Sequence, residues 1–219
     1  VDVLVESQPL SDKQSTKKQI DRLRARGATN VHEALIKGLE QVEKGQAQGV
    51  LSRIIFLSDG EATEGETDDE LILALAKKAR EIGVAISTLG VGEDYDEVLL
   101  SDIAQVSGGN HYFINGPEKI KEVYSLELKR LRAVIAQNVN LDISLVEGAK
   151  LAQLNLRYPY EQTVEGAKVS LDEAVAGALQ KCLLDMEIEP RQIGEYQLGE
   201  VKLSFDDIIS GERRELRGQ

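Results

Sequence analysis

Along the first two thirds of the chain, short runs of apolar residues alternate with segments in which apolar residues recur at helical spacing. Four large apolar residues, Ile54 to Leu57, stand in a row and are followed by Asp59 and Gly60, a pattern typical of a strand buried on both faces of a parallel sheet. Val84 to Val91 and His111 to Ile114 predict two further strands. Apolar residues at helical spacing, preceded by capping or first-turn residues, predict helices that begin near Asn30, Thr67, Glu97 and Pro117.

The beginning of the chain carries a weaker signal of the same kind. Val1, Val3 and Val5 alternate with other residues and predict a short edge strand. A polar helix is expected to follow and to end at Gly27. Strands and helices that take turns in this way predict an α/β fold, Rossmann-like, with a doubly wound and mostly parallel sheet over residues 1–137.

After about residue 138 the hydrophobic period changes from 3.6 to 2. Val139, Leu141, Ile143 and Leu145 alternate with polar residues, and similar runs lead up to Ile188 and Phe205. Residues 138–219 are therefore expected to form a second domain, antiparallel and β-sandwich-like. The alternation changes phase between Tyr196 and Phe205, which predicts a β-bulge at Gly199.

Composition narrows the range of partners. The chain has 219 residues, with 26 Lys and Arg against 38 Asp and Glu, for a net charge of -12, so binding to nucleic acid or anionic lipid is disfavoured. No apolar run approaches the ~20 residues of a membrane span, and we expect no membrane insertion. The single cysteine, Cys182, excludes a disulfide framework within the chain. The compartment is open: we expect a cytoplasmic location, with a mature secreted or surface form as the alternative.

The candidate chemistry lies where the first buried strand ends. Asp59 follows that strand directly, and in open α/β sheets ligands bind at the carboxyl ends of the strands. Thr29 precedes a predicted helix and can place its hydroxyl in the same crevice. A carboxylate and a hydroxyl suit a hard divalent cation, which prefers oxygen ligands. Plain turn formation by Ser58, Asp59 and Gly60 is the alternative interpretation.

Four separated motifs resemble the von Willebrand factor A domain family. They are Gly-Ala-Thr-Asn before a helix, Ile-Ile-Phe-Leu-Ser-Asp-Gly-Glu, Ile-Ser-Thr-Leu-Gly-Val-Gly before an acidic turn, and Ile-Ala-Gln-Val-Ser-Gly-Gly-Asn-His-Tyr-Phe-Ile. The resemblance covers residues 1–137. The remainder is similar, more loosely, to the β domain that follows the A domain in many bacterial members.

The resemblance implies a metal-ion-dependent adhesion site in which three loops hold Mg²⁺, or Mn²⁺ or Ca²⁺. Thr29 matches the second loop and Asp59 the third, while Asn30, Gly60 and Glu61 would belong to the ligand surface. The first motif, Asp-x-Ser-x-Ser, is absent from this chain: the nearest match, Asp142-Ile143-Ser144, lacks the last serine and lies in the β region. We therefore expect metal binding to be weak or absent without an N-terminal segment that carries this motif.

The resemblance also implies a function. The chain matches the family from its edge strand onward, after its first strand and helix, so a missing N-terminal segment or a neighbouring chain is expected to complete the sheet. We expect a non-enzymatic protein-binding or adhesion module, in which an acidic side chain of a protein partner completes the metal site. One alternative is a scaffold with an incomplete or vestigial metal site. Another is an Mg²⁺-dependent phosphoryl-transfer enzyme with Asp59 as acceptor, although the chain has no Gly-x-x-x-x-Gly-Lys loop.

Overall fold

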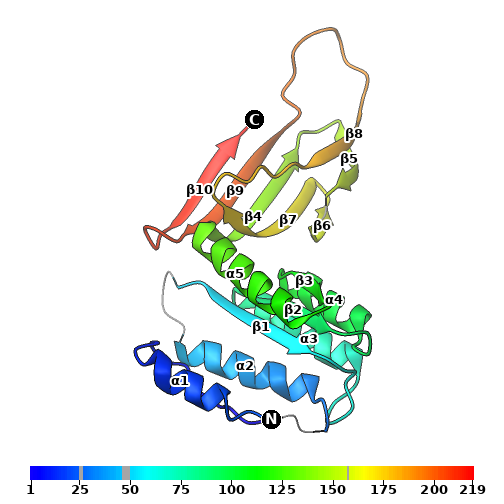
Figure 1. Cartoon of the computed structure of the whole chain (residues 1–219). Coiled ribbons are helices and arrows are strands. Elements are labelled where there is room, and N and C mark those ends of the chain that lie inside the picture. Colours follow the sequence, from blue (N-terminus) through cyan, green and yellow to red (C-terminus); the bar gives the residue numbers. More distant parts are fainter. Residues whose placement is uncertain (25–26, 46–49, 157) are drawn as a thin grey trace. The chain divides into compact units, whose positions relative to one another are not determined.

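The computed structural model describes residues 1–24, 27–45, 50–156 and 158–219. The chain divides into two compact units, Val1–Leu128 and Lys129–Gln219 (Figure 1). Each unit has a hydrophobic core of its own.

The first unit is built on a parallel sheet of three strands. The strands are β1 (Ser52–Ser58), β2 (Val84–Val91) and β3 (His111–Ile114), and they lie in the order β1-β2-β3. Ser52 is the register partner of Val84, and Thr88 is that of His111. The middle strand is buried along almost its whole length, as expected for a parallel strand with neighbours on both sides.

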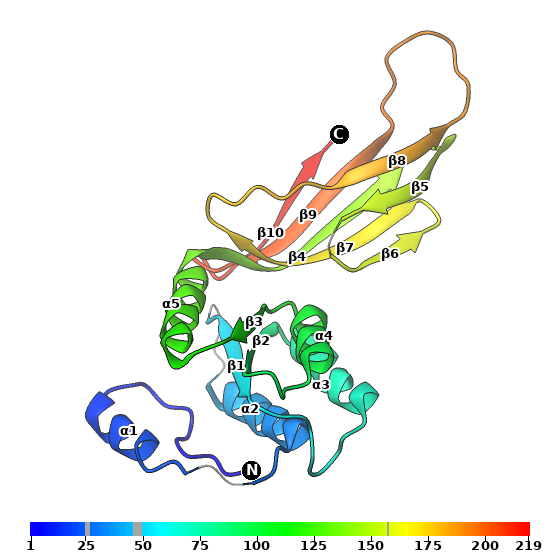
Figure 2. The same cartoon turned by 45° about the vertical axis from the view of Figure 1, so that its right-hand side comes forward.

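Helices cover both faces of this sheet (Figure 2). They are α2 (Val31–Gly45), α3 (Asp69–Glu81) and α4 (Glu97–Ser107) on one face and α5 (Pro117–Ala133) on the other. Leu35, Ile72 and Ile103, one from each of the first three helices, are fully buried with Ile86 of β2. On the opposite face, Val123 of α5 packs against the strands. The doubly wound α/β class is confirmed.

The prediction for the first 24 residues is wrong in two respects. Residues 1–5 form no strand, because alternation alone does not make a strand without a neighbour to complete its hydrogen bonds; the amino group of Val1 instead pairs with Glu33 at 3.1 Å. Helix α1 (Lys13–Ile20) ends at its cap Asp21 rather than at Gly27, and none of its residues is buried. A helix that buries no apolar face gains little from further turns.

Two of the predicted helix caps can be checked in the structure. Asn30 begins α2, and its Oδ1 accepts a hydrogen bond from the Glu33 N–H at 2.9 Å. Helix α3 is capped by Asp68 rather than by Thr67, because Asp68 Oδ1 accepts from the Glu70 N–H at 2.9 Å. Aspartate ranks above threonine as an N-cap, which accounts for the shift by one residue.

The turn between α4 and β3 holds that helix against the sheet. The Ser107 hydroxyl accepts a hydrogen bond from the Ile86 N–H at 3.0 Å and donates one to the Ile103 carbonyl at 2.8 Å. Gly108 ends α4 with a φ of +81°. A Cβ on Gly109 would lie 2.0 Å from the carbonyl oxygen of Ile86, so only glycine permits this close approach.

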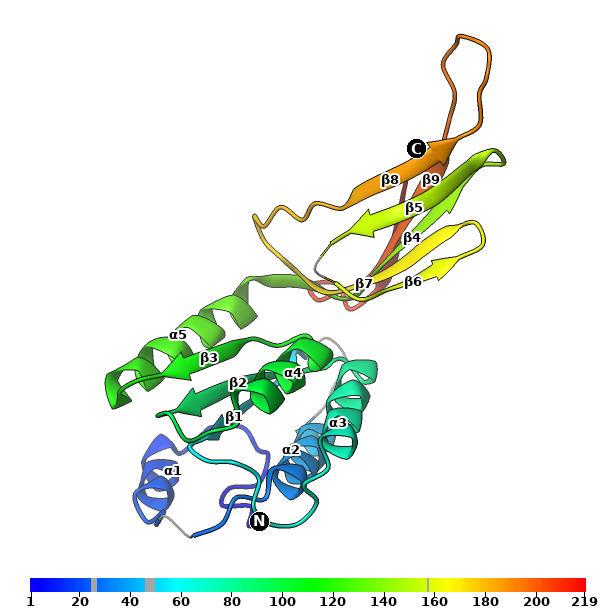
Figure 3. The same cartoon turned by 90° about the vertical axis from the view of Figure 1, so that its right-hand side faces the viewer.

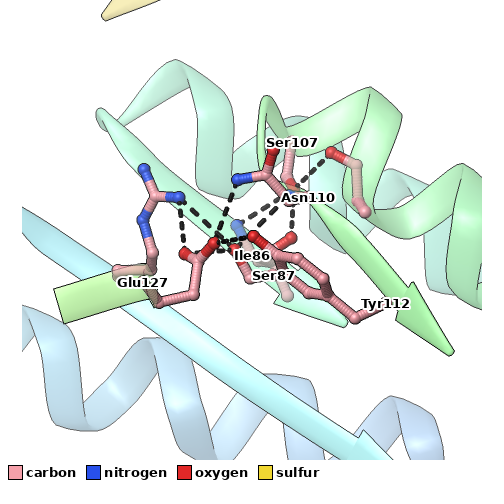
Figure 4. A network of polar contacts seen from close by, with 8 residues as sticks. Ile86, Ser87, Ser107, Asn110, Tyr112 and Glu127 are labelled. Atoms are coloured by element: carbon pink, nitrogen blue, oxygen red, sulfur yellow. Dashed lines mark hydrogen bonds and ion pairs between the residues drawn. The ribbon is translucent and has the colours of Figure 1, made fainter. Parts of the chain in front are cut away.

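A buried charge network fastens α5 to the sheet (Figure 4). Glu127 of α5 is fully buried, and its Oε2 lies 3.0 Å from Nη1 of Arg53 at the beginning of β1. The carboxylate also accepts hydrogen bonds from the hydroxyls of Ser87, at 2.8 Å, and Tyr112, and from Asn110 Nδ2 at 3.2 Å. Burial would raise the pKa of Glu127, but the two hydroxyls and the Arg53 charge outweigh it and hold this pKa below its ordinary value.

The second unit is antiparallel throughout (Figure 3). Its strands are β4 (Val134–Leu145), β5 (Ala149–Asn155), β6 (Tyr160–Thr163), β7 (Gly166–Val175), β8 (Leu183–Ile188), β9 (Gly199–Asp207) and β10 (Arg213–Gly218). They form a sheet in the order β10-β9-β4-β7-β6 and a two-stranded sheet β5-β8. Ile143, Leu151, Val169 and Leu184 come from both sheets and share one core, so the sandwich-like prediction is confirmed.

Strand β4 begins before residue 138, and the irregularity in its pairing with β9 lies in β4 rather than at Gly199. Val134, within the range 1–137 predicted for the α/β domain, begins β4, so the change from helix to strand precedes residue 137. The register shift with β9 lies between Gln137 and Asn140, where Asn138 has a φ of 52°. Gly199 is no bulge: it is the first residue of β9, and a Cβ there would lie 2.4 Å from a β4 carbonyl oxygen. The phase changes because residues 196–198 precede the strand.

Candidate metal centre

Thr29 and Asp59 lie on two loops that hydrogen bonds join to each other. The carbonyl oxygen of Thr29 accepts from the N–H groups of Thr63, at 2.9 Å, and Glu64, at 3.2 Å. The Thr29 N–H in turn donates to the Thr63 hydroxyl at 3.0 Å. The loop that carries Thr29 is therefore fixed against the loop that follows β1.

The end of β1 presents Asp59 to solvent. Ser58, the last residue of the strand, is buried, and its hydroxyl donates to the Gly60 carbonyl at 3.0 Å. Asp59 between them is exposed. A Cβ built on Gly60 would lie 3.6 Å from Thr29 Oγ1, which places the threonine hydroxyl beside the residue that follows Asp59. The structure thus brings the two predicted ligand positions to one place.

Asn30 and Glu61, which we expected at the ligand surface, differ in their surroundings. The Asn30 amide is used locally, since its Nδ2 donates to the Glu33 carboxylate at 3.1 Å while its Oδ1 caps α2. Its amide also packs against Gly65, where a Cβ would lie 2.4 Å from Nδ2. Glu61 is exposed. Every charged residue between Arg53 and Lys77 is acidic, so this edge of the sheet attracts cations.

The donor set fits a divalent cation only in part. Thr29 supplies a hydroxyl and Asp59 a carboxylate, both of which are oxygen ligands of the kind that Mg²⁺ prefers. In the described ranges there is no group of three or more His, Cys, Asp or Glu residues that could hold a metal ion. Mg²⁺ requires near-octahedral coordination, so two protein groups leave most positions to water or to ligands from another segment.

Two hydroxyl residues shape this site: Ser58, which belongs to the turn given above as the alternative interpretation of this segment, and Thr63, which the sequence does not indicate. Ser58 closes the turn at the strand end, and Thr63 holds the Thr29 loop in place. Both stand within or beside the run of acidic residues that follows β1. The contact of Thr63 depends on a partner 34 positions away, so no local pattern indicates it.

Comparison with known proteins identifies the family. The model of the von Willebrand factor type A domain matches residues 1–125. This chain belongs to that family. The resemblance of the four motifs is thereby confirmed. Domains of this family commonly act as metal-dependent protein-interaction modules and are generally non-enzymatic.

Relatives in sequence extend the likeness beyond the A domain. "Uncharacterized protein sll0103" of Synechocystis sp. is 26% identical over 96% of this chain and 51% of its own length. "Uncharacterized protein YfbK" of Escherichia coli is 34% identical over 57% of this chain and 22% of its own length. The chain thus spans about half of the first relative and a smaller share of the second.

No described helix has both the length and the apolar character of a membrane span.

A solved structure shows the same fold over both units. "von Willebrand factor type A from Catenulispora acidiphila" superposes with a TM-score of 0.69, at 19% identity, over 95% of this chain and 51% of that one. At this level of identity the similarity concerns the fold alone. It includes the A domain and the antiparallel β unit that follows it.

Proposed function

We propose that this chain is a non-enzymatic protein-binding module that acts through a divalent cation at the carboxyl end of β1. Thr29 and Asp59 would hold the ion, directly or through water, and Mg²⁺, Mn²⁺ or Ca²⁺ suits their oxygen atoms. When bound, the ion would supply a coordination position for an acidic side chain of a protein partner. The observation that carries this proposal is the hydrogen bonding that joins the Thr29 loop to the loop after β1.

The unpaired edge of β1 supports the proposal that another segment supplies further metal ligands. Among the described residues β1 pairs with β2 alone, although its apolar sequence is that of an inner strand. Leu57 is 42% exposed, and no residue of α1 is buried. An inner strand without a neighbour exposes apolar surface and unpaired backbone groups. We infer that a strand from a preceding segment or a neighbouring chain pairs with β1 and brings the Asp-x-Ser-x-Ser ligands to the site.

Isothermal titration calorimetry tests both parts. Mg²⁺ and Mn²⁺ are titrated into the chain alone and into the chain joined to a strand segment that carries Asp-x-Ser-x-Ser. The completed protein should bind more tightly, because a carboxylate and two hydroxyls are added. Asp59→Ala should weaken its binding by about 10- to 100-fold, the size seen when groups around a metal are removed. Glu61→Gln is the matched control, since it removes a charge from the same loop without removing a proposed ligand.

Two results would contradict the proposal. If Asp59→Ala and Thr29→Val both leave cation binding unchanged in the completed protein, these residues do not hold the ion. If neither form binds a cation, the chain is the scaffold with a vestigial site that the sequence leaves open.

A further inference from the structure

An exposed aromatic side chain lies on the free edge of the three-stranded sheet. Strand β3 pairs only with β2 in the described part of the chain, and Phe113 on this strand is 55% exposed. Tyr112 and Ile114 pack on the face that α5 covers. Because side chains alternate along a strand, Phe113 and His111 lie on the other face, next to α4.

A second ring lies against Phe113 at the carboxyl end of β2. Gly90 is the register partner of Phe113, and a Cβ on Gly90 would lie 2.1 Å from the ring of Tyr95. Glycine therefore leaves the space that the tyrosine ring occupies. The rings of Tyr95 and Phe113 are stacked, with centroids 6.2 Å apart and planes inclined by 26°. We call these two rings the ring platform.

The imidazole of His111, which lies beside the ring platform, is neutral. Thr88 Oγ1 donates to the carbonyl of Leu100 at 2.7 Å, so it accepts from His111 Nδ1 at 3.0 Å. The other ring nitrogen, Nε2, then accepts from the Tyr95 hydroxyl, 3.4 Å away. This directed chain of hydrogen bonds needs a neutral imidazole. Burial lowers the pKa of His111, against the opposing effect of Glu97 on α4, which favours the same state.

The chain around Tyr95 is acidic. All charged residues between Arg80 and Lys119 are acidic. Glu93, Asp94 and Glu97 flank Tyr95, are exposed, and form no ion pair within the described ranges. Burial raises the pKa of the Tyr95 hydroxyl, and the negative charge of Glu97 raises it further.

We propose that the ring platform, with Glu97, is a docking surface for an arginine side chain of a protein partner. A guanidinium stacks on aromatic faces through its planar charge and forms hydrogen bonds to carboxylates. The exposed ring of Phe113, stacked with the partly buried ring of Tyr95, and the acidic residues that flank Tyr95 meet both requirements. A purely apolar partner segment can pack on the rings but forms no hydrogen bonds to the carboxylates. An acidic segment is repelled by them.

The position of the platform relates it to the proposed function. Ser58 of β1, Gly90 and Phe113 form one row across the sheet, so two strand spacings, about 10 Å, separate β1 from β3. If the metal proposal holds, the partner would present a carboxylate to the ion and an arginine about this far away. The arginine contact itself needs no metal.

NMR titration of the full chain in EDTA tests the contact separately from the metal. The probe is the capped peptide Gly-Arg-Gly, and the control peptide contains citrulline, which has nearly the same shape without the charge. The arginine peptide should shift resonances of Tyr95 and Phe113 in a saturable manner, and the citrulline peptide should not. Phe113→Ala should weaken binding by about twofold to fivefold, the size of an exposed cation–π contact.

Two further variants make the result decisive. Glu97→Gln, at an exposed position, should weaken binding to a similar degree and reduce its salt dependence. Tyr124→Ala removes a partly exposed ring from α5 and should leave binding unchanged. Equal shifts with both peptides, or no change in affinity in either Phe113→Ala or Glu97→Gln, would overturn the proposal. Because EDTA is present throughout, failure of the metal site would not affect this outcome.

Discussion

Replacing Glu127 with alanine should destabilise the first unit strongly. The side chains of Glu127 and Arg53 are 0% and 4% exposed, so the variant leaves a buried guanidinium without its counter-charge. Removing one partner of a buried ion pair costs about 3–5 kcal/mol. The hydroxyl of Ser87, which is also buried, loses its acceptor as well, at about 1–3 kcal/mol for a buried group left unsatisfied. Against a domain stability of about 5–15 kcal/mol, we expect a loss of at least 3 kcal/mol.

Urea unfolding followed by circular dichroism at the helix band measures this loss. All described helices end by Ala133, so the helix signal reports mainly on the first unit, and linear extrapolation gives its free energy of unfolding. The double variant Arg53→Met with Glu127→Leu should recover part of the loss, since no unpaired charge remains. A loss below about 1 kcal/mol in Glu127→Ala, with no recovery in the double variant, would refute a stabilising role for the pair.

The same pair predicts a pH dependence of known sign. The pKa of Glu127 in the folded protein lies below its ordinary value, while in the unfolded chain it is about 4.3. The carboxylate therefore contributes stability that is fully present above pH about 4.3 and is lost as the pH falls through the folded pKa. Glu127→Gln should remove this part of the acid sensitivity, so the difference in unfolding free energy between the two proteins should narrow towards low pH.

Three further variants probe local features. Gly109→Ala should lower stability by about 1–3 kcal/mol, as overpacking does, because its Cβ would lie 2.0 Å from the Ile86 carbonyl oxygen; urea unfolding with no loss would contradict this contact. Asp68→Ala should cost about 1 kcal/mol as a lost N-cap and Thr67→Ala much less, and equal losses would contradict the Asp68 cap. Burial lowers the pKa of His111, so its contribution to thermal stability should decline as the pH falls below about 6.5, and His111→Gln should remove that decline.

The arrangement of the first unit was accessible from sequence because its signals are local. The apolar run Ile54 to Leu57 lies in β1, and Val84 to Val91 gives the bounds of β2 as the structure has them. A strand with neighbours on both sides or a helix packed on a sheet must be apolar at fixed intervals. The capping role of Asn30 follows from its own side chain and needs no distant partner.

Features that depend on distant partners were not accessible. Val1 to Val5 show the alternation of a strand, yet a strand also needs a neighbour, which the alternation does not reveal. The phase change before Phe205 predicts a bulge at Gly199, whereas Gly199 begins β9, and the register shift of this strand pair lies in β4, around Asn138. A change of phase can mark the beginning of a strand as well as a bulge within it, and only the strand pairing distinguishes the two.

The candidate site shows the same division. Asp59 could be found because an acid follows an apolar strand, and Thr29 because it precedes a helix. The buried ion pair of α5 and β1, which lies outside the candidate site, could not be found from the sequence. Leu126 and Leu128 are exposed, while Glu127 between them is fully buried. Hydrophobic periodicity assigns these three positions the opposite way. The charge is buried because an arginine 74 positions earlier faces it, and no local pattern reveals that.

The buried ion pair and the candidate metal site lie at opposite ends of β1, so effects on stability and on binding can be measured separately. Arg53 stands at the beginning of β1 and Asp59 directly after its end, and six residues of extended chain span about 20 Å. Over that distance an exposed charge is largely screened at physiological salt, where the Debye length is about 8 Å. Loss of Glu127 should therefore reduce the fraction of folded molecules without changing the affinity of those that remain folded. Asp59→Ala should do the reverse, because Asp59 is exposed and its removal leaves no buried group unpaired.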